Sequence, residues 1–226
     1  AGRLSSRSIT SDQSYRYDYA YNSIGAIDTV TYPFSPVPSG QSGARFAVRY
    51  GYSYGEVARI EDVTVAAQPR VLWSLTASND DRQPTSESIG NGALALQNAF
   101  DPATGRLLAR QAGTSGSAAD RQSLAYQWDA AGNLTQRRDA LQNLTEAFTV
   151  DALDRITGST LNGAPNFAVT YDATGNIRSR SDVGTYSYGH PSKPHAVTSA
   201  GSETLDYDAN GNVVLRNGLP QQWASF

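Results

Sequence analysis

Apolar and polar residues alternate over short runs along most of the chain. Between residues 167 and 171, for example, Phe167, Val169 and Tyr171 are separated by Ala168 and Thr170. A period of two places the larger side chains on one face of a β-strand. The runs end at Gly, Asp or Asn, which are typical of tight turns. The pattern predicts an all-β protein of consecutive antiparallel β-hairpins, and no apolar run is long enough to cross a bilayer.

One unit of the pattern recurs with nearly the same letters. It reads WDAAGNL at 128–134, YDATGNI at 171–177 and YDANGNV at 207–213. In such a unit the Asp carboxylate can accept backbone N–H groups two residues on, and the Gly can take the left-handed conformation that closes a short loop. We predict that these aromatic, Asp and Gly residues anchor the fold. The predicted anchors are Phe100, Trp128, Asp129, Gly132, Tyr171, Asp172, Gly175, Tyr207, Asp208 and Gly211.

Looser copies extend the repeat toward both ends of the chain. Tyr21, Tyr52 and Tyr188 continue the series of aromatic anchors, while VDALDRIT at 150–157 lacks the Gly and is expected to turn differently. Phe226 falls where a further anchor is due, so we expect the chain to stop inside a repeat. We expect one continuous architectural unit, with degenerate hairpins in 1–94 and clearer repeats in 95–226.

The units WDAAGNLTQRRDALQN, YDATGNIRSRSDVGTYSYG and LDYDANGNVVLRNG resemble the YD repeats of the Rhs family. Similar repeats occur in teneurins and in the B–C cocoon of insecticidal Tc toxins. The resemblance implies a curved sheet that spirals into a hollow shell. It further implies a non-enzymatic shell segment of a secreted or surface-delivered bacterial protein, whose partners are the remaining repeats and an enclosed toxin or other cargo polypeptide. The self-cleavage region and variable toxin of Rhs proteins have no counterpart here, so neither activity carries over.

Composition narrows the possible chemistry. The chain has no Cys, which excludes disulfides and thiolate metal sites. Its 18 basic and 21 acidic residues are nearly balanced and form no basic cluster of the kind that binds nucleic acid. We expect no cofactor.

The 13 tyrosines leave two interpretations open. Tyr15, Tyr17, Tyr19 and Tyr21 alternate along one run, and so do the tyrosines of 50–54. An exposed row of this kind could bind carbohydrate or a cell-surface partner. A packed row would stabilise the sheet, and this is the interpretation we favour.

A polysaccharide-processing enzyme is a second alternative. His190 and His195 are the only histidines, and they could activate Ser192 or Ser199 or hold zinc. The Pro residues around them favour a plain connection between repeats.

The stretch from Asp206 to Asn217 resembles the start of a calcium-binding loop. Asp206, Asp208 and Asn210 alternate, but Asn217 stands where such a loop needs a bidentate Glu. The repeat already accounts for most of these letters, so we expect no metal there.

Overall fold

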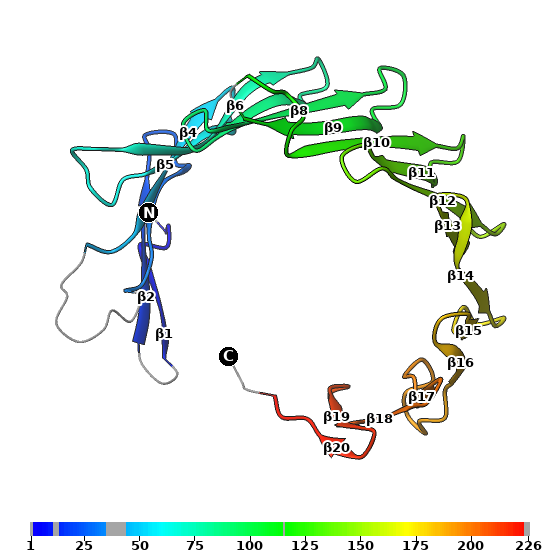
Figure 1. Cartoon of the computed structure of the whole chain (residues 1–226). Helices are drawn as coiled ribbons and strands as arrows, with labels where there is room; N and C mark the ends of the chain where they lie inside the picture. Colours follow the sequence, from blue (N-terminus) through cyan, green and yellow to red (C-terminus); the bar gives the residue numbers. More distant parts are fainter. Residues whose placement is uncertain (1, 11–13, 35–43, 115, 224–226) are drawn as a thin grey trace. The chain divides into compact units, whose positions relative to one another are not determined.

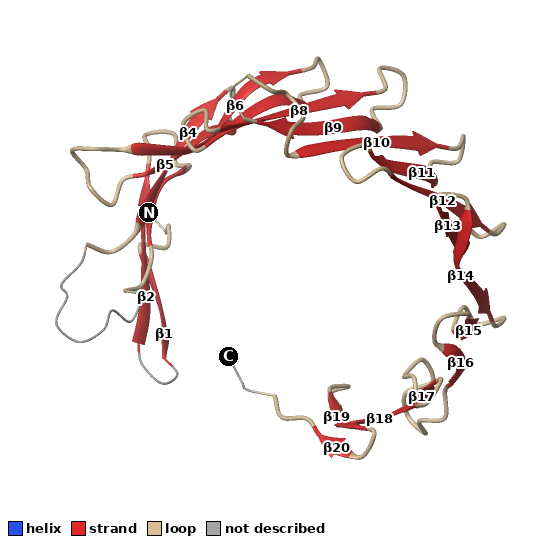
Figure 2. Cartoon of the chain, in the orientation of Figure 1, coloured by secondary structure: helices blue, strands red, loops and turns tan. Residues whose placement is uncertain are grey.

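The computed structural model describes residues 2–10, 14–34, 44–114 and 116–223, which contain strands and loops and no helix (Figure 2). No helix within these ranges could therefore span a membrane. The predicted all-β class is confirmed. The chain divides into two compact units, Ala1–Ala125 and Tyr126–Phe226. The division expected near residue 94 separates degenerate hairpins from clearer repeats in the sequence. It stays a prediction.

The first unit is a run of antiparallel strands in which each strand pairs with the next (Figure 1). Its strands are β1 (Ser6–Thr10), β2 (Ser14–Tyr21), β3 (Ile27–Thr31), β4 (Ala47–Ser53), β5 (Glu56–Asp62), β6 (Arg70–Ser78), β7 (Pro84–Ile89), β8 (Leu94–Phe100) and β9 (Leu107–Gly113), followed by β10 (Gln122–Trp128), which ends beyond the unit boundary.

The second unit has the same neighbour-to-neighbour order from β11 onward. Its strands are β11 (Leu134–Asp139), β12 (Leu144–Val150), β13 (Ile156–Leu161), β14 (Ala164–Tyr171), β15 (Ile177–Arg180), β16 (Gly184–Ser187), β17 (Ser199–Ala200), β18 (Glu203–Tyr207), β19 (Val213–Arg216) and β20 (Leu219–Pro220).

The two faces of the strands differ in polarity. In the first unit, cross-strand pairing sets Val30 between Tyr19 and Val48, so aromatic and aliphatic residues share one face. A row on the other face of β7 to β10 is polar. It consists of Ser86, Gln97, Gln111 and Ser123.

Packing is confined to a single layer of strands. Every strand-to-strand contact in the described ranges joins strands that are neighbours in sequence. The chain exposes 15060 Å², whereas a globular protein of its mass exposes about 10,000 Å². Few side chains are therefore buried. The buried hydrophobic residues in the described ranges are Val30, Val48, Leu96, Ala112 and Val169.

The tyrosine rows are packed, except at one position. The tyrosines of β2 are half-buried, and Tyr17 lies edge-on to Tyr32 with ring centroids 5.8 Å apart. Tyr50 and Tyr52 are half-buried on β4, but Tyr54 lies beyond the end of this strand and is 98% exposed. The expectation that Tyr54 continues the strand is wrong, because Tyr54 and Gly55 both have positive φ and form the turn to β5.

The loop that joins β7 to β8 contains Asn91 and Gly92, which both have positive φ. Most of the Gly- and Ser-rich stretch 35–45 lies outside the described residues. Of the stretch 112–120, the first two residues belong to β9, and the loop begins after them.

Candidate functional site

The repeated unit folds as one compact turn, which is seen clearly after β14. The backbone N–H of Asp172 donates to Asn176 O at 2.9 Å, and that of Gly175 donates to Asp172 O at 3.1 Å. Oδ1 of Asp172 accepts the N–H groups of Thr174 and Asn176 at 2.9 and 3.0 Å. Gly175 has φ +91°, and one extra residue shifts the register just before Tyr171. This is a type I turn closed by a Gly bulge.

The same turn recurs in both units, with Asp or Asn first and a left-handed residue fourth. We call it the repeated turn. Its first residue donates its N–H to the fifth and accepts from the fourth, with N···O distances from 2.8 to 3.2 Å. The turn after Phe100 is one residue longer, since Gly105 and Arg106 take the fourth and fifth roles. The first residues are Asn22, Asn79, Asp101, Asp129, Asp151, Asp172 and Asp208.

The turn after Val150 corrects a prediction. The unit lacks Gly and was expected to turn differently, yet Asp154 takes the left-handed conformation with φ +59°. Its N–H donates to Asp151 O at 3.1 Å, as Gly175 does in its own unit. Asp is one of the few residues that enter this region at small cost, which explains why the turn is unchanged.

Asn replaces Asp as the first residue of two repeated turns. One of these turns directly follows the expected anchor Tyr21, and the turn at Asn79 was missed in the sequence. Asn22 Oδ1 accepts the N–H of Ala26, and Asn79 Oδ1 accepts that of Gln83. The residue before Asn79 is Ser78, where most other units have an aromatic anchor. Arg82 occupies the left-handed fourth position of the turn, with φ +62°. An Asn followed three positions later by Gly is the signal for the turn at Asn22, whereas Arg82 leaves the turn at Asn79 without such a signal.

Hydrogen bonds within the turns lower the pKa of the turn carboxylates. The side chain of Asn133 donates to Asp129 and lowers its pKa, and backbone N–H groups of the turn act in the same direction. Asn212 lowers the pKa of Asp208 in the same way, while at Asp172 the hydroxyl of Thr174 is the largest cause. A carboxylate that accepts several N–H bonds is stabilised relative to the acid.

Several repeats also contact the repeat before them through an aromatic side chain. Tyr171 Oη donates to Ile156 O at 2.8 Å, and Ile156 is the fifth residue after Asp151. Tyr52 donates to Ile27 O at 2.7 Å, again the fifth residue after the turn's first residue. Tyr188 repeats this geometry on Ile177 O at 2.9 Å. We call this bond the anchor contact.

The last anchor contact comes from a residue that the spacing did not select. Trp223 Nε1 donates to Val213 O at 2.7 Å, and Val213 is the fifth residue after Asp208. Phe226, expected to be the next anchor, lies outside the described residues.

The remaining predicted anchors differ in the contacts that their side chains form. Tyr207 donates to Val197 O at 2.8 Å, on a segment that has no repeated turn. Phe100 cannot donate and is paired with Leu107 across its hairpin. Trp128 ends β10 directly before the Asp129 turn, in which Gly132 has φ +103° and donates to Asp129 O. Gly211 has φ +90° in the last turn. That these residues are the structural anchors stays a prediction.

Comparison with solved structures places this geometry among known folds. A structure of a Photorhabdus luminescens Tc holotoxin pore matches with a TM-score of 0.66 at 16% identity, over 90% of this chain. A crystal structure of TcdB2–TccC3 without its hypervariable C-terminal region matches with a TM-score of 0.67 at 13% identity, over 96% of this chain. The chain has the Rhs/YD-repeat fold. It spans only 12–13% of the length of those chains, and neither a family model nor a curated protein matches it.

The histidines of this chain lie in the loop between β16 and β17. His195 Nδ1 lies 2.7 Å from Asn176 Oδ1, in the preceding repeated turn, and the His190 ring packs edge-on against Tyr207. His190 Nδ1 is 3.4 Å from Ser192 Oγ, a long contact for activation of a hydroxyl. Within the described ranges the hydrogen-bond partner of His190 is Ser192.

The candidate calcium loop is a strand end followed by a repeated turn. Both carboxylate oxygens of Asp208 are used within the turn, since Oδ1 accepts from Asn212 N and Oδ2 accepts from Asn212 Nδ2, each at 2.9 Å. Asn217 Oδ1 accepts the N–H of Thr204. Across the described part of the chain, no three His, Cys, Asp or Glu residues gather as metal ligands would.

Proposed function

We propose that this chain is a non-enzymatic segment of the wall of a hollow Rhs/Tc-like shell. The shell belongs to a secreted or surface-delivered bacterial protein, and it encloses a toxin or other cargo polypeptide. The observation that carries the proposal is that, within the described residues, each strand contacts only strands that neighbour it in sequence. Each repeat therefore lengthens a single-layer strip without closing a core of its own, as a wall requires.

The chemistry of the repeats supports a structural role. The repeated turns hold their aspartates with N–H donors from the same loop, and the anchor contacts use the tyrosine hydroxyls. These polar groups therefore form hydrogen bonds within the fold itself. The partners of such a segment are further repeats of the same shell, paired along the strip, and the cargo behind the wall.

The outermost strand of the first unit is suited to receive a further repeat. Within the described residues β1 pairs with β2 alone. Tyr19 N–H donates to Ser5 O at 2.9 Å, and hydrogen-bonded pairs alternate along an antiparallel ladder. Arg7 therefore turns its backbone groups toward β2, whereas Ser8 turns its groups toward the open side. Such an edge is a template for another strand.

Edge pairing can be tested by light scattering of the 226-residue chain over a range of concentrations. The proposal predicts that the mass grows with concentration and that Ser8→Pro stops growth beyond a dimer, because one edge per chain is then blocked. Arg7→Pro is the matched control, since it removes an N–H that faces β2 and should lower the melting temperature. A parent chain that stays monomeric, or a Ser8→Pro variant that associates like the parent, would overturn the proposal.

A further inference from the structure

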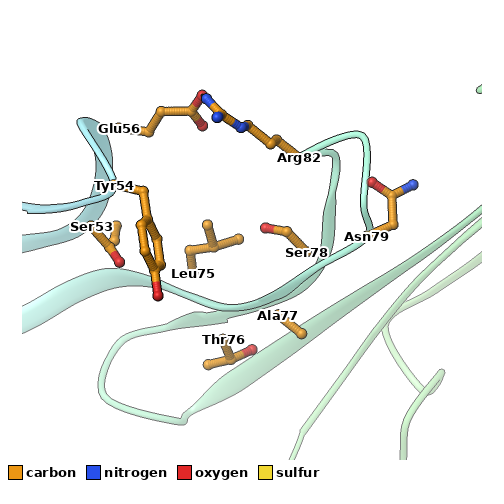
Figure 3. A pocket seen from close by; sticks show the side chains of 10 residues that line it. Ser53, Tyr54, Glu56, Leu75, Thr76, Ala77, Ser78, Asn79 and Arg82 are labelled. Carbon is orange, nitrogen blue, oxygen red and sulfur yellow. The ribbon is translucent and has the colours of Figure 1, made fainter.

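A groove lies between two hairpin tips of the first unit (Figure 3). One tip, between β4 and β5, contributes Tyr54 and Glu56, and the other, after β6, contributes Asn79 and Arg82. Leu75 lies between the two tips, so the groove has an apolar part with polar rims (Figure 3).

Two unusual backbone conformations meet at this groove. Tyr54 has φ +51° and Arg82 has φ +62°. The five other non-Gly residues with positive φ in the described ranges are all Asn or Asp, which tolerate this region. A bulky side chain there is strained, and residues held in such conformations cluster at functional sites. Both exceptions line one groove, which marks it out from the rest of the strip.

Packing within the sheet does not explain why a tyrosine occupies position 54. It is 98% exposed, so its ring buries almost nothing. Gly55 follows it in a two-residue turn where Asn would be favoured. The other tyrosines of the predicted rows, such as Tyr17 and Tyr52, are half-buried in the sheet. Tyr54 therefore offers a free aromatic face at the groove.

The opposite rim offers hydrogen-bonding groups of both charges. Arg82 Nη1 lies 3.6 Å from Glu56 Oε1, and both side chains are mostly exposed. Such a surface pair is weak and can be rearranged by a ligand. The Ser78 hydroxyl lines the groove and makes no hydrogen bond within the described part of the chain. One cation, one anion and a hydroxyl give donors and acceptors without net charge.

We propose that this groove binds a neutral hexopyranose unit of a glycan. The Tyr54 ring stacks on the C–H face of the sugar, and Arg82, Glu56 and Ser78 hydrogen-bond its hydroxyls. A nucleotide or phosphorylated ligand fits less well, because Glu56 opposes the charge of Arg82 and no Gly-rich phosphate loop is present. This binding site adds an activity to the proposed wall segment and does not depend on it.

The test is titration of the full 226-residue chain with D-glucose, D-galactose, D-mannose and N-acetyl-D-glucosamine, followed by saturation-transfer NMR. We expect at least one sugar to bind and Tyr54→Asn to weaken it by about tenfold or more. Tyr54→Asn should also raise the melting temperature, because Asn relieves the strained turn. Tyr54→Phe keeps the ring and should bind like the parent.

Leu153→Asn is the matched surface control, since Leu153 is an exposed loop residue of the other unit. It should leave binding unchanged. The proposal is overturned if none of the four sugars shows binding when each is present at 10 mM. This concentration is high enough to detect a weak site with a binding free energy of about −3 kcal/mol. It is equally overturned if a sugar binds Tyr54→Asn and the parent with the same affinity.

Discussion

At the residue scale, the fourth position of the repeated turn shows what the backbone demands of a side chain. Gly132, Gly175 and Gly211 occupy it at φ between +90° and +103°. Asp154 and Arg82 occupy it near +60°. Gly is therefore preferred but not obligatory, and the requirement is a left-handed backbone whose N–H reaches back to the first residue.

Replacing Gly175 with Val should destabilise the second unit. A β-branched residue resists the left-handed conformation, and the strain is about 1–2 kcal/mol. Urea unfolding followed by circular dichroism measures the change. Gly175→Asp is the matched control and should cost clearly less, because Asp154 already fills the equivalent position. Equal losses in the two variants would show that backbone strain is not the cause.

Replacing Tyr171 with Phe should remove one anchor contact and leave the ring in place. The bond to Ile156 O lies at the surface, so we expect a loss of about 0.5–1 kcal/mol in the free energy of unfolding. Tyr186→Phe is the control, since the Tyr186 hydroxyl makes no hydrogen bond in the described ranges. If both variants lose the same stability, the anchor contact contributes nothing of its own.

At the element scale, the hairpin with its repeated turn is the unit that the sequence encodes most clearly. Alternation in 167–171 predicted β14, and YDATGN predicted the turn after it, because Asp and Gly have distinct local roles. The turn at Asn79 could not be found from this pattern, because Asn79 and Arg82 replace both the Asp and the Gly. The groove at Tyr54 could not be predicted either, because alternation alone cannot show that a strand ends at Ser53.

The repeated turns should give the protein a characteristic dependence on acid. Folding lowers the pKa of Asp129, Asp172 and Asp208. The stability they contribute is therefore complete above the unfolded pKa of about 3.9 and is lost as the pH falls through the folded values. Thermal melts should show a constant melting temperature from about pH 8 to 5 and a decline below about pH 4.

The control for this acid dependence is a triple variant with Asn at all three positions. Asn22 shows that an Asn side chain can cap the same turn without an ionisable group. The triple variant should fold at neutral pH and decline less in acid. A decline as steep as that of the parent would assign the acid dependence to other carboxylates.

At the scale of the whole molecule, what distinguishes this chain is how little it buries. In the part of the chain that the structure describes, strands contact only their sequence neighbours, and the exposed area of the chain is 15060 Å². A protein with this organisation gains stability from ladders of hydrogen bonds and from same-face packing between adjacent hairpins. It is well suited to be extended by further repeats, which is the basis of the proposed wall segment.

The most direct test of the wall-segment account is small-angle X-ray scattering of the chain at a concentration where light scattering gives the mass of one chain. A globular protein of 226 residues has a radius of gyration of about 17 Å. The account predicts a clearly larger radius, because a single-layer strip encloses no core. A radius near 17 Å for the monomer would mean that the repeats close on themselves, and it would contradict the account.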